Sequence, residues 1–548
     1  NNWLCSRIIQ IKKNLIGKDE YTSCGQLGAA RMEGAVVKME KQGKVWLVGA
    51  GPSDPGLLTL KGKQLLEQAQ VVVYDALVSA AILAMIPNDA ELIYVGKRAG
   101  NHPVPQDQIN QILLAKAQEG KRVVRLKGGD PFLFGRGGEE LELLAAHHIP
   151  FEVVPGITSA LAVPAYNGIP VTHRDYCSSV HIITAHSKKG GELKINFPAL
   201  CALEGTLVFL MGVTSMEMVC EGLVKAGMDP QMPAAILQEG TSAVQRRVVA
   251  TVSDLPQKAR EANIQAPSVL IVGKVCALEK TLSWTQNRPL DGVRVVLTRP
   301  KELVSRMAYR LYELGAEVIE LPAICLEPYV ENSQLSKALS NISDYQWAAF
   351  TSITGVRVFF DFLQKNRCDL RALSHLRFAA IGPGTEKELE RHGIFADLVP
   401  ERYYAKDLAE ALAAQMQPGQ HVLLPRAKIG SAELTDTLRE RGIAYTDIPL
   451  YDTVYTIQNS SAVQKLVTEG KISCVTFTSA STVKGFAAAM QGTDLTGLLA
   501  ACIGEKTAQA ARETGMQVLI SRQATIDSLC ELLVERADQL KLNRTITD

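Results

Sequence analysis

Residues 123–140 read VVRLKGGDPFLFGRGGEE, and this stretch decides how we expect the first half of the chain to fold. The apolar residues Val123, Val124 and Leu126 predict a strand that leads into Gly-Gly-Asp-Pro at 128–131. Glycines at the end of a strand allow the backbone to approach a ligand closely, because they carry no Cβ. The aspartate offers an acceptor for a ribose hydroxyl or an amine, and Arg136 and Glu139 add opposite charges. We therefore predict a ligand loop rather than a tight turn before a solvated helix.

A second glycine loop, GAGPSDPG at 49–56, follows the apolar run 45–48. It resembles the dinucleotide pattern GxGxxG, but Asp54 stands at the third glycine position. Pro52 and Pro55 also lack the backbone N–H groups that a pyrophosphate needs. A stiff, acidic loop favours a neutral or cationic ligand, and S-adenosylmethionine, a sulfonium that carries an adenosine, fits this description. A nicotinamide-dependent oxidoreductase is the disfavoured alternative.

Composition limits the remaining classes of function. The chain has 548 residues, 47% of them hydrophobic, which predicts three or four structural units. A formal net charge of +1 favours neither nucleic acid nor an anionic membrane as a partner. No apolar run has the length of a membrane span and no secretory signal is visible. The 11 cysteines form no CxxC motif, so we expect no metal, no disulfide framework and a cytoplasmic location.

Strands alternate with helical patterns from about residue 44 to residue 160, which predicts a parallel sheet with crossover helices. From residue 179 the strands follow one another more closely and are richer in β-branched residues, so we predict a second, more mixed sheet in a lobe of about 170–285. Residues 160–175, rich in proline and glycine, are expected to form the hinge between these lobes. Residues 1–43 are treated as an N-terminal extension of unknown role.

The second half of the chain contains an internal duplication, and we place it at 293–548 after a linker at 286–292. LTRP, FTS and IGPGT, which begin at residues 297, 350 and 381, recur in the same order as LPRA, FTS and IGEKT, 127, 127 and 122 positions later. The repeat predicts two similar doubly wound α/β lobes around a shared cleft. We expect at least one Ser or Thr of each box to cap a helix, where free N–H groups would also bind carboxylates.

The first half resembles the tetrapyrrole methylases, most closely the uroporphyrinogen-III C-methyltransferases. The resemblance spans about residues 44–285 and rests on GAGPSDPGLLTLKG (49–62), VVYD (72–75), VGKRAG (95–100), QDQIN (106–110), VVRLKGGDPFLFGRGGEE (123–140), VVPGIT (153–158), GIPVTHRD (168–175) and VFLMG (208–212). The second half resembles uroporphyrinogen-III synthase in FTSITGV, AAIGPGT, LLPRA, IPLYDTV, FTSAST and CIGEKTA. The fusion of the two halves supports both assignments, because the methylase would consume the product of the synthase.

The methylase resemblance implies two methyl transfers from S-adenosylmethionine to uroporphyrinogen III, with the donor bound between the two lobes. The implied donor contacts are Pro52, Gly128, Gly129, Asp130, Leu133, Thr158, Ser159, Met211 and Gly240. Asp75 and Lys97 correspond to a proton acceptor and a proton donor, and Arg136 and Glu139 lie near the reacting pyrrole in relatives. Further substrate positions are Arg174 and His186. The proposal requires the two glycine loops to lie together. Relatives often have Arg where Ala76 stands, which puts one substrate contact in doubt.

The synthase resemblance implies closure of hydroxymethylbilane to uroporphyrinogen III with inversion of the last ring. Tyr451 matches a tyrosine that assists the departing hydroxyl, and the implied carboxylate contacts are Thr351, Ser352, Thr385, Thr478, Ser479 and Thr507. The resemblance also implies a homodimer through the methyltransferase domain and a product for siroheme or cobalamin biosynthesis. Two alternatives stay open: a non-catalytic, two-lobed ligand-binding C-terminal module, and methylation of a later corrinoid intermediate.

Overall fold

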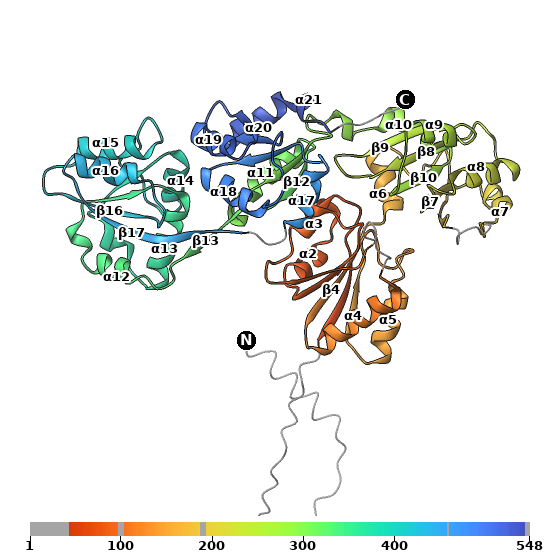
Figure 1. Ribbon diagram of the computed structural model, residues 1–548, viewed down its shortest axis with the longest axis horizontal. Coiled ribbons are helices and arrows are strands. Elements are labelled where there is room, and N and C mark those ends of the chain that lie inside the picture. Colours follow the sequence, from red (N-terminus) through yellow and green to blue (C-terminus); the bar gives the residue numbers. More distant parts are fainter. Residues whose placement is uncertain (1–42, 97–103, 187–192, 457–459, 543–548) are drawn as a thin grey trace, which may run out of the picture. The chain divides into compact units, whose positions relative to one another are not determined.

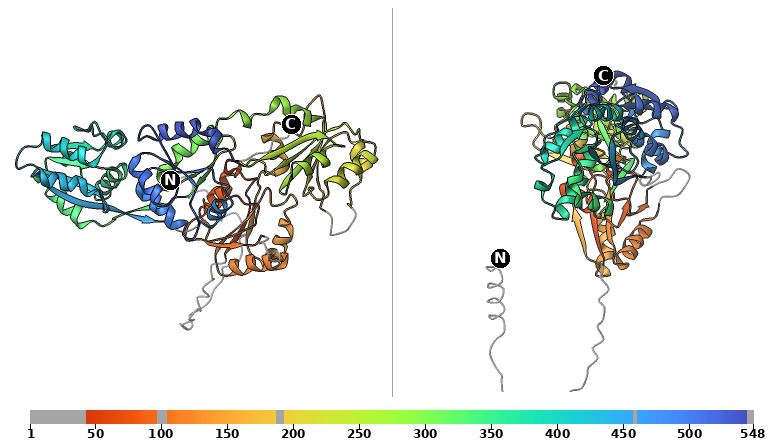
Figure 2. Two further views of the ribbon diagram at one scale, coloured as in Figure 1. Left: turned by 45° about the horizontal axis from the view of Figure 1, so that its top comes forward. Right: turned by 90° about the vertical axis from the view of Figure 1, so that its left-hand side faces the viewer.

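The computed structural model describes residues 43–96, 104–186, 193–456 and 460–542, which form four five-stranded sheets (Figure 1, Figure 2). The first sheet has the strand order β3-β2-β4-β1-β5, and every neighbouring pair in it is parallel. Its strands are β1 (Lys44–Gly49), β2 (Val71–Tyr74), β3 (Glu91–Tyr94), β4 (Arg122–Lys127) and β5 (Phe151–Val154). The parallel sheet predicted from the alternating pattern is therefore confirmed.

Alternation along these strands explains how the first sheet is covered on both faces. Val45 and Leu47 contribute to one apolar cluster together with residues of α4 (Gln106–Gln118) and α5 (Gly137–Ala146). Trp46 and Val48 contribute to a second cluster with residues of α2 (Leu60–Leu66) and α3 (Ala80–Leu83). Because successive side chains of a strand point to opposite faces, an apolar strand without polar alternation is a strand buried on both sides.

The second sheet is mixed, as the closer strand spacing predicted. Its order is β6-β7-β10-β8-β9, with β6 and β7 parallel and the other neighbours antiparallel. The strands are β6 (Val180–Thr184), β7 (Thr206–Leu210), β8 (Pro233–Gln238), β9 (Arg246–Thr251) and β10 (Ser268–Val272). The accompanying helices are α7 (Phe197–Ala202), α8 (Met216–Lys225), α9 (Leu255–Glu261) and α10 (Glu279–Leu282).

The hinge expected at 160–175 is wrong in its first part, because helix α6 (Ser159–Tyr166) occupies it. Pro164 lies inside this helix, where it removes one backbone hydrogen bond. The helix persists because Ala160, Val163 and Pro164 are buried, and Val163 packs in a cluster with strands of the mixed sheet. Burial of the apolar face of this helix outweighs the low helix propensity of one proline.

The two remaining sheets confirm two similar α/β lobes in the second half. One has the order β12-β11-β18-β19-β20 and the other β13-β17-β16-β14-β15. Their strands are β11 (Arg294–Leu297), β12 (Glu317–Glu320), β13 (Ile324–Pro328), β14 (Trp347–Phe350), β15 (Arg377–Ala380), β16 (His421–Ala427), β17 (Ala444–Tyr455), β18 (Cys474–Phe477), β19 (Leu499–Cys502) and β20 (Gln517–Ile520).

The repeats do not each form one lobe. Strand β11 comes from the first repeat but pairs with β18 of the second, while β16 of the second pairs with β14 of the first, and both pairings are parallel. Each lobe therefore combines the opening strand of one repeat with the later strands of the other. The sequence duplication predicted two lobes but did not predict this exchange.

Helices cover both faces of these sheets. Figure 1 shows α15 (Ala405–Gln415) and α16 (Ala432–Glu440) on one side of β16 and β17, with α12 (Ser333–Ser340) and α13 (Ile353–Lys365) on the other. The remaining helices are α11 (Lys301–Glu313), α14 (Pro383–Arg391), α17 (Ser461–Thr468), α18 (Ala480–Ala489), α19 (Glu505–Glu513), α20 (Ile526–Glu535) and α21 (Ala537–Leu540). In the part of the chain that the structure describes, no helix is long and apolar enough to cross a membrane.

An ion cluster on the first sheet leads to a prediction about pH. Glu152 Oε2 lies 2.8 Å from Lys44 Nζ and accepts a hydrogen bond from Trp46 Nε1, and Lys61 forms a further ion pair with this carboxylate. The hydrogen bonds from Lys44 and Lys61 lower the pKa of Glu152 from 4.5 to about 2. A depressed folded-state pKa stabilises the native state above the unfolded pKa, and this contribution is lost as the pH falls from 4.5 towards 2.

We therefore expect Glu152→Gln to unfold at a lower temperature than the wild-type protein at pH 7 and pH 5, and the difference to shrink towards pH 2. Thermal unfolding followed by circular dichroism at matched pH values measures this. Glu142, an exposed glutamate of α5, provides the control Glu142→Gln. A difference between wild type and Glu152→Gln that stays constant from pH 7 to pH 2 would contradict the ion cluster.

Candidate functional site

The two glycine loops lie against each other at the carboxyl ends of β1 and β4. Gly51 N donates to Gly129 O at 3.1 Å, and Gly129 N donates to Gly51 O at 2.9 Å. Gly156, which follows β5, completes the contact: a Cβ on it would lie 2.2 Å from Gly129 O, and a Cβ on Gly49 would lie 2.5 Å from Gly156 Cα. The close approach at Gly49 and Gly156 is possible only because these residues have no side chain. We call Gly49, Gly51, Gly129 and Gly156 the glycine junction.

Asp130 organises the loop in which it lies. Its Oδ1 accepts hydrogen bonds from the N–H groups of Phe132 at 2.8 Å and Leu133 at 3.1 Å, and its Oδ2 accepts one from Gly156 N at 3.1 Å. A carboxylate has about four acceptor positions, so one position remains for a ligand hydroxyl or amine. The side chain thus fixes the loop and retains the capacity to bind that the sequence analysis assigned to it.

Asp54 has a structural task that explains the failed GxGxxG match. Its Oδ1 accepts a hydrogen bond from Gly56 N at 2.7 Å, and its Oδ2 accepts one from Tyr166 Oη at 2.7 Å. Its own N–H donates to Thr241 Oγ1 at 3.2 Å. Burial, together with the nearby Asp54 carboxylate, raises the pKa of Tyr166, so this phenol stays a hydrogen-bond donor. An acid is therefore needed where a dinucleotide loop has glycine.

The nine positions assigned to the methyl donor all lie after the carboxyl ends of strands, eight in loops and Ser159 as the first residue of α6. They follow β1 (Pro52), β4 (Gly128, Gly129, Asp130 and Leu133), β5 (Thr158 and Ser159), β7 (Met211) and β8 (Gly240). Thr158 caps α6 by accepting a hydrogen bond from Ala160 N at 3.3 Å. Met211 has a positive φ of 58° and is 49% exposed. Gly240 packs against Val163 of α6, since a Cβ there would lie 2.3 Å from a Val163 methyl.

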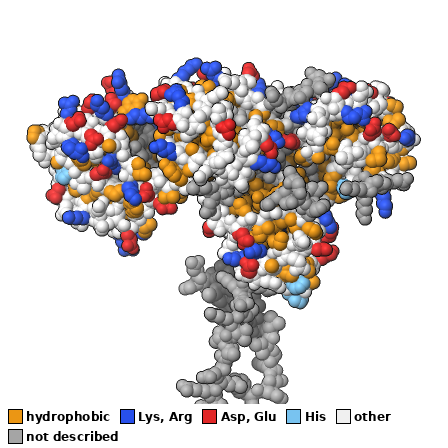
Figure 3. All heavy atoms as spheres, viewed as in Figure 1, with side chains coloured by type: hydrophobic (Ala, Val, Ile, Leu, Met, Phe, Trp, Pro, Cys, Tyr) orange, Lys and Arg blue, Asp and Glu red, His pale blue; other side chains and the backbone are white. Residues whose placement is uncertain are grey.

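Large apolar side chains are exposed around these loops. Leu77, Phe132 and Met211 are each about half exposed, at 56%, 57% and 49%. Figure 3 shows hydrophobic side chains at the surface of the lobe that carries the first sheet. Exposed apolar surface beside polar loops is typical of a site for a ligand with a large hydrophobic face.

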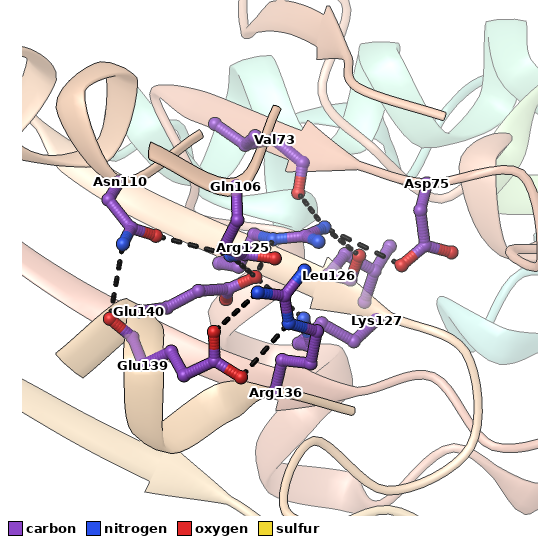
Figure 4. A network of polar contacts seen from close by, with 10 residues as sticks. All are labelled: Val73, Asp75, Gln106, Asn110, Arg125, Leu126, Lys127, Arg136, Glu139 and Glu140. Carbon is purple, nitrogen blue, oxygen red and sulfur yellow. Dashed lines mark hydrogen bonds and ion pairs between the residues drawn. The ribbon is translucent and has the colours of Figure 1, made fainter. Parts of the chain in front are cut away.

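A buried network of charges adjoins Asp75, which follows β2 (Figure 4). Arg125 NH1 lies 3.6 Å from Asp75 Oδ2, and Arg125 Nε lies 3.3 Å from Glu140 Oε1. Lys127 Nζ lies 2.7 Å from the same Glu140 oxygen, and Gln106 donates to it at 3.2 Å. Desolvation, followed by the neighbouring Arg125 charge, lowers the pKa of Lys127.

Sequence reasoning missed this network as a unit. Arg125 and Lys127 are 3% and 5% exposed and Glu140 is fully buried, although all three are charged. The sequence does contain one indication of this network. Arg125 and Lys127 are two positions apart in an otherwise apolar strand, so both side chains lie on one face of the sheet. Asp75 also accepts a hydrogen bond from Leu77 N at 3.1 Å, so it serves the turn as well as facing Arg125. Lys97 lies outside the described residues.

The remaining methylase positions are at the surface. Arg136 directly precedes α5 and has a φ of 57°. Its Nε donates to Glu139 Oε1 at 2.9 Å, so the predicted opposite charges pair with each other. The hydrogen bond from Arg136 lowers the pKa of Glu139. Arg174 and His186 are exposed, and neither is in the network around Asp75.

The structure brings Tyr451 and Ser352 together across 99 residues of sequence. Tyr451 Oη and Ser352 Oγ are 3.0 Å apart, and Ser352 Oγ also accepts a hydrogen bond from Gly355 N at 2.9 Å at the start of α13. Tyr451 is 5% exposed, and burial raises its pKa. The phenol therefore keeps its proton at neutral pH, as a proton donor must.

The expectation of a capping Ser or Thr in each box is confirmed for the two FTS boxes and wrong for IGPGT, IGEKT and LTRP, the last because Pro300 precedes α11 without a side-chain cap. Ser352 caps α13 and Ser479 caps α18, the latter in a reciprocal arrangement with Thr482. Thr385 and Thr507 cap no helix, because α14 and α19 begin after Gly382 and Gly504, which have no side chain to accept a hydrogen bond. Both threonines are buried, at 4% and 5% exposure. Thr351 and Thr478 directly follow β14 and β18.

Comparison with known proteins supplies the family. The model of the tetrapyrrole (corrin/porphyrin) methylases matches residues 44–256, and that of uroporphyrinogen-III synthase HemD matches residues 305–531. Porphyrin biosynthesis protein HemD of Ruminiclostridium josui is 48% identical over 495 residues, which are 90% of this chain and 98% of that protein. The chain belongs to the family of this protein. It is a bifunctional enzyme of tetrapyrrole biosynthesis, in which a methylase precedes a HemD-type synthase.

Two further relatives match the methylase half of this fusion. Siroheme synthase 2 of Cronobacter sakazakii is 54% identical over 250 residues, which are 46% of this chain and 54% of that protein, so the chain spans about half of its length. The solved uroporphyrin-III C-methyl transferase of Thermus thermophilus, complexed with S-adenyl homocysteine, is 38% identical, with a TM-score of 0.38. The match covers 43% of this chain and 99% of that one.

Within residues 43–96, 104–186, 193–456 and 460–542, no group of three or more His, Cys, Asp or Glu side chains could hold a metal ion.

Proposed function

We propose that the C-terminal half cyclises hydroxymethylbilane to uroporphyrinogen III and that the N-terminal half methylates this product twice with S-adenosylmethionine, to the dihydrosirohydrochlorin (precorrin) stage. The observation that carries the methylase assignment is the glycine junction, where three strand ends meet with no side chain between them. The residues next to it suit a cationic donor, because Asp54 and Asp130 are acidic and Pro52 and Pro55 are stiff. S-adenosylmethionine would supply an electrophilic methyl group.

In the proposed methylation, the protein binds the macrocycle and moves a proton. The pyrrole carbon would attack the methyl group as its bond to the donor sulfur breaks, and Asp75 would then accept the proton that the resulting macrocycle cation loses. The Arg125 guanidinium at 3.6 Å would keep this carboxylate in place. Arg136 would bind an acetate or propionate group through the two-pronged contact that it now makes with Glu139. Lys97 is proposed as the proton donor, Glu139 would act beside the reacting pyrrole, and Arg174 and His186 would contact substrate carboxylates.

In the proposed cyclisation, Tyr451 would protonate the hydroxyl that leaves the linear tetrapyrrole. Its buried phenol and its contact with Ser352 support this role. The remaining work is to hold the chain so that only the inverted ring closes, which is a task of proximity. Thr351, Ser352, Thr385, Thr478, Ser479 and Thr507 are proposed to hold carboxylates, with free helix N–H groups beside them.

One assay tests both halves together. Hydroxymethylbilane and S-adenosylmethionine are supplied to the full chain, and the product is followed by absorbance and mass. We expect a dimethylated, strongly absorbing product with the methyl donor, and the III isomer of uroporphyrinogen without it. Methylation of supplied uroporphyrinogen III alongside only the spontaneous I isomer from hydroxymethylbilane would instead favour a non-catalytic C-terminal module.

A variant of Asp75 tests the proton acceptor. We expect Asp75→Asn to lower the rate of methyl transfer by about 100-fold or more, because the amide can still accept the Leu77 hydrogen bond but cannot take a proton. Methylation of supplied uroporphyrinogen III measures the change, and thermal unfolding of the same preparation followed by circular dichroism reports folding. The control is Asp89→Asn, at an exposed aspartate of the same lobe. A wild-type rate in Asp75→Asn would remove Asp75 from the mechanism.

A further inference from the structure

Arg299 lies at the carboxyl end of β11, inside the edge where the hydroxyl residues of one synthase lobe gather. Strand β11 pairs in parallel with β18, and Thr298 Oγ1 donates to Thr476 O at 2.7 Å, so the segment after β11 runs beside the one that carries Thr478 and Ser479. Arg299 is therefore next to positions already assigned to substrate carboxylates. Ligands of parallel sheets bind at this edge.

The internal duplication provides a matched comparison, because LTRP and LPRA place Arg299 and Arg426 at equivalent positions. Arg426 is 5% exposed and fully paired: its Nε and NH2 donate to the two oxygens of Asp447 at 2.8 and 2.6 Å, and its NH1 donates to Ser431 O at 2.8 Å. This arginine is a structural residue of its lobe.

Arg299 has no such partners among the described residues. Its Nε is buried without a hydrogen-bond acceptor, and burial alone lowers its pKa. By strand register, Glu320 occupies the position equivalent to Asp447, opposite Leu297 as Asp447 is opposite Leu424, yet it forms no ion pair with Arg299. A desolvated guanidinium without a counter-charge is costly, and a bound carboxylate would remove this cost.

We propose that Arg299 binds an acetate or propionate carboxylate of the linear tetrapyrrole. This inference deepens the proposed cyclisation and rests on it. The planar guanidinium offers two parallel donors to a carboxylate, a geometry that lysine does not provide. Of the two equivalent arginines, one supports the fold and the other is kept for the ligand.

The test uses the full chain and three variants: Arg299→Gln, Arg299→Lys and the control Arg306→Gln. Arg306 lies on α11, the helix that follows Arg299, and its side chain is 85% exposed. For Arg299→Gln we expect the KM for hydroxymethylbilane to rise about 10- to 100-fold, with a smaller change in kcat, because one charged hydrogen-bonded contact is lost. Arg299→Lys should be intermediate, and Arg306→Gln should match the wild type.

A second measurement does not require turnover. Calorimetric titration with uroporphyrin III, a stable octacarboxylate, should show weaker binding to Arg299→Gln than to the wild type, and the methylase half contributes equally to both titrations. Thermal unfolding followed by circular dichroism reports whether each variant is folded. If Arg299→Gln is not folded, Arg299→Lys provides the test. Lysine lacks the planar guanidinium, so an unchanged KM for hydroxymethylbilane in Arg299→Lys overturns the proposal.

A KM and a titration within twofold of wild type in Arg299→Gln would also overturn the proposal. If the wild-type chain does not convert hydroxymethylbilane, the proposed cyclisation fails. In that case the titration still tests Arg299, because weaker binding of uroporphyrin III to Arg299→Gln would make Arg299 an anion-binding residue of a non-catalytic module. The two failures are therefore distinguishable.

Discussion

We expect the Gly156→Ala protein to lose methyl transfer by at least about 100-fold, since a displacement of about 1 Å at a reacting site has an effect of that size. A Cβ at residue 156 would lie 2.2 Å from Gly129 O and 2.7 Å from Gly49 Cα. Both neighbours are backbone atoms, so they cannot rotate away as a flexible side chain would. The glycine junction must open, and the hydrogen bond from Gly156 N to Asp130 changes with it.

Methylation of supplied uroporphyrinogen III measures this loss, and conversion of hydroxymethylbilane by the same preparation shows that the other half is intact. Gly138→Ala is the matched control, because Gly138 is exposed in α5 and a Cβ there would have no neighbour within 4 Å. Alanine in a helix should stabilise this position by about 1 kcal/mol and leave both activities unchanged. Full methylation by Gly156→Ala would show that the junction does not shape the site.

The second large effect is expected at Tyr451. Tyr451→Phe removes only the phenol oxygen and should lower the rate of cyclisation by about 100-fold or more, the usual contribution of a proton donor. The raised pKa of Tyr451 keeps the phenol protonated up to alkaline pH, so the wild-type rate should show no loss from this group between pH 6 and about pH 9. The ratio of III to I isomer, measured by chromatography, gives the enzymatic rate against spontaneous closure.

Tyr345→Phe separates chemistry from packing. Tyr345 is buried in the same apolar cluster as Tyr451, and its phenol oxygen lies 3.2 Å from Thr446 Oγ1. Both substitutions therefore remove one hydroxyl contact from the same lobe. Equal losses in the two variants would show that Tyr451 matters only for stability, while methylation should be unaffected in both.

The positions of the strands were predictable where the pattern was local. Strands that lead into glycines, such as 45–51 with its apolar run VWLV, marked both the strands and the loops at their carboxyl ends, because strand burial and close backbone approach depend on neighbouring residues. The expected hinge at 160–175 was wrong in part, because the contacts of Val163 with a distant sheet override the local effect of Pro164.

The candidate site was predictable only in pieces. Tyr451 and Ser352 could each be named from their boxes, but their 3.0 Å contact depends on how β17 and β14 are placed within one sheet. Arg125 and Glu140 look in sequence like ordinary charges of a strand and a helix. Their burial and pairing with Lys127 follow from the packing of α5 on the sheet, which no local pattern records.

The sequence by itself determined the sheets of the methylase half, the position of the glycine loops and the existence of two similar lobes after residue 293. The hydrophobic period, the positions of the glycines and the internal repeat can all be read from the sequence without a structure. Only the tertiary structure decided that the repeats exchange strands, so that β11 pairs with β18 and β16 with β14. Two nearly equivalent repeats offer similar strand edges to each other, and the choice between them is made by packing over the whole domain.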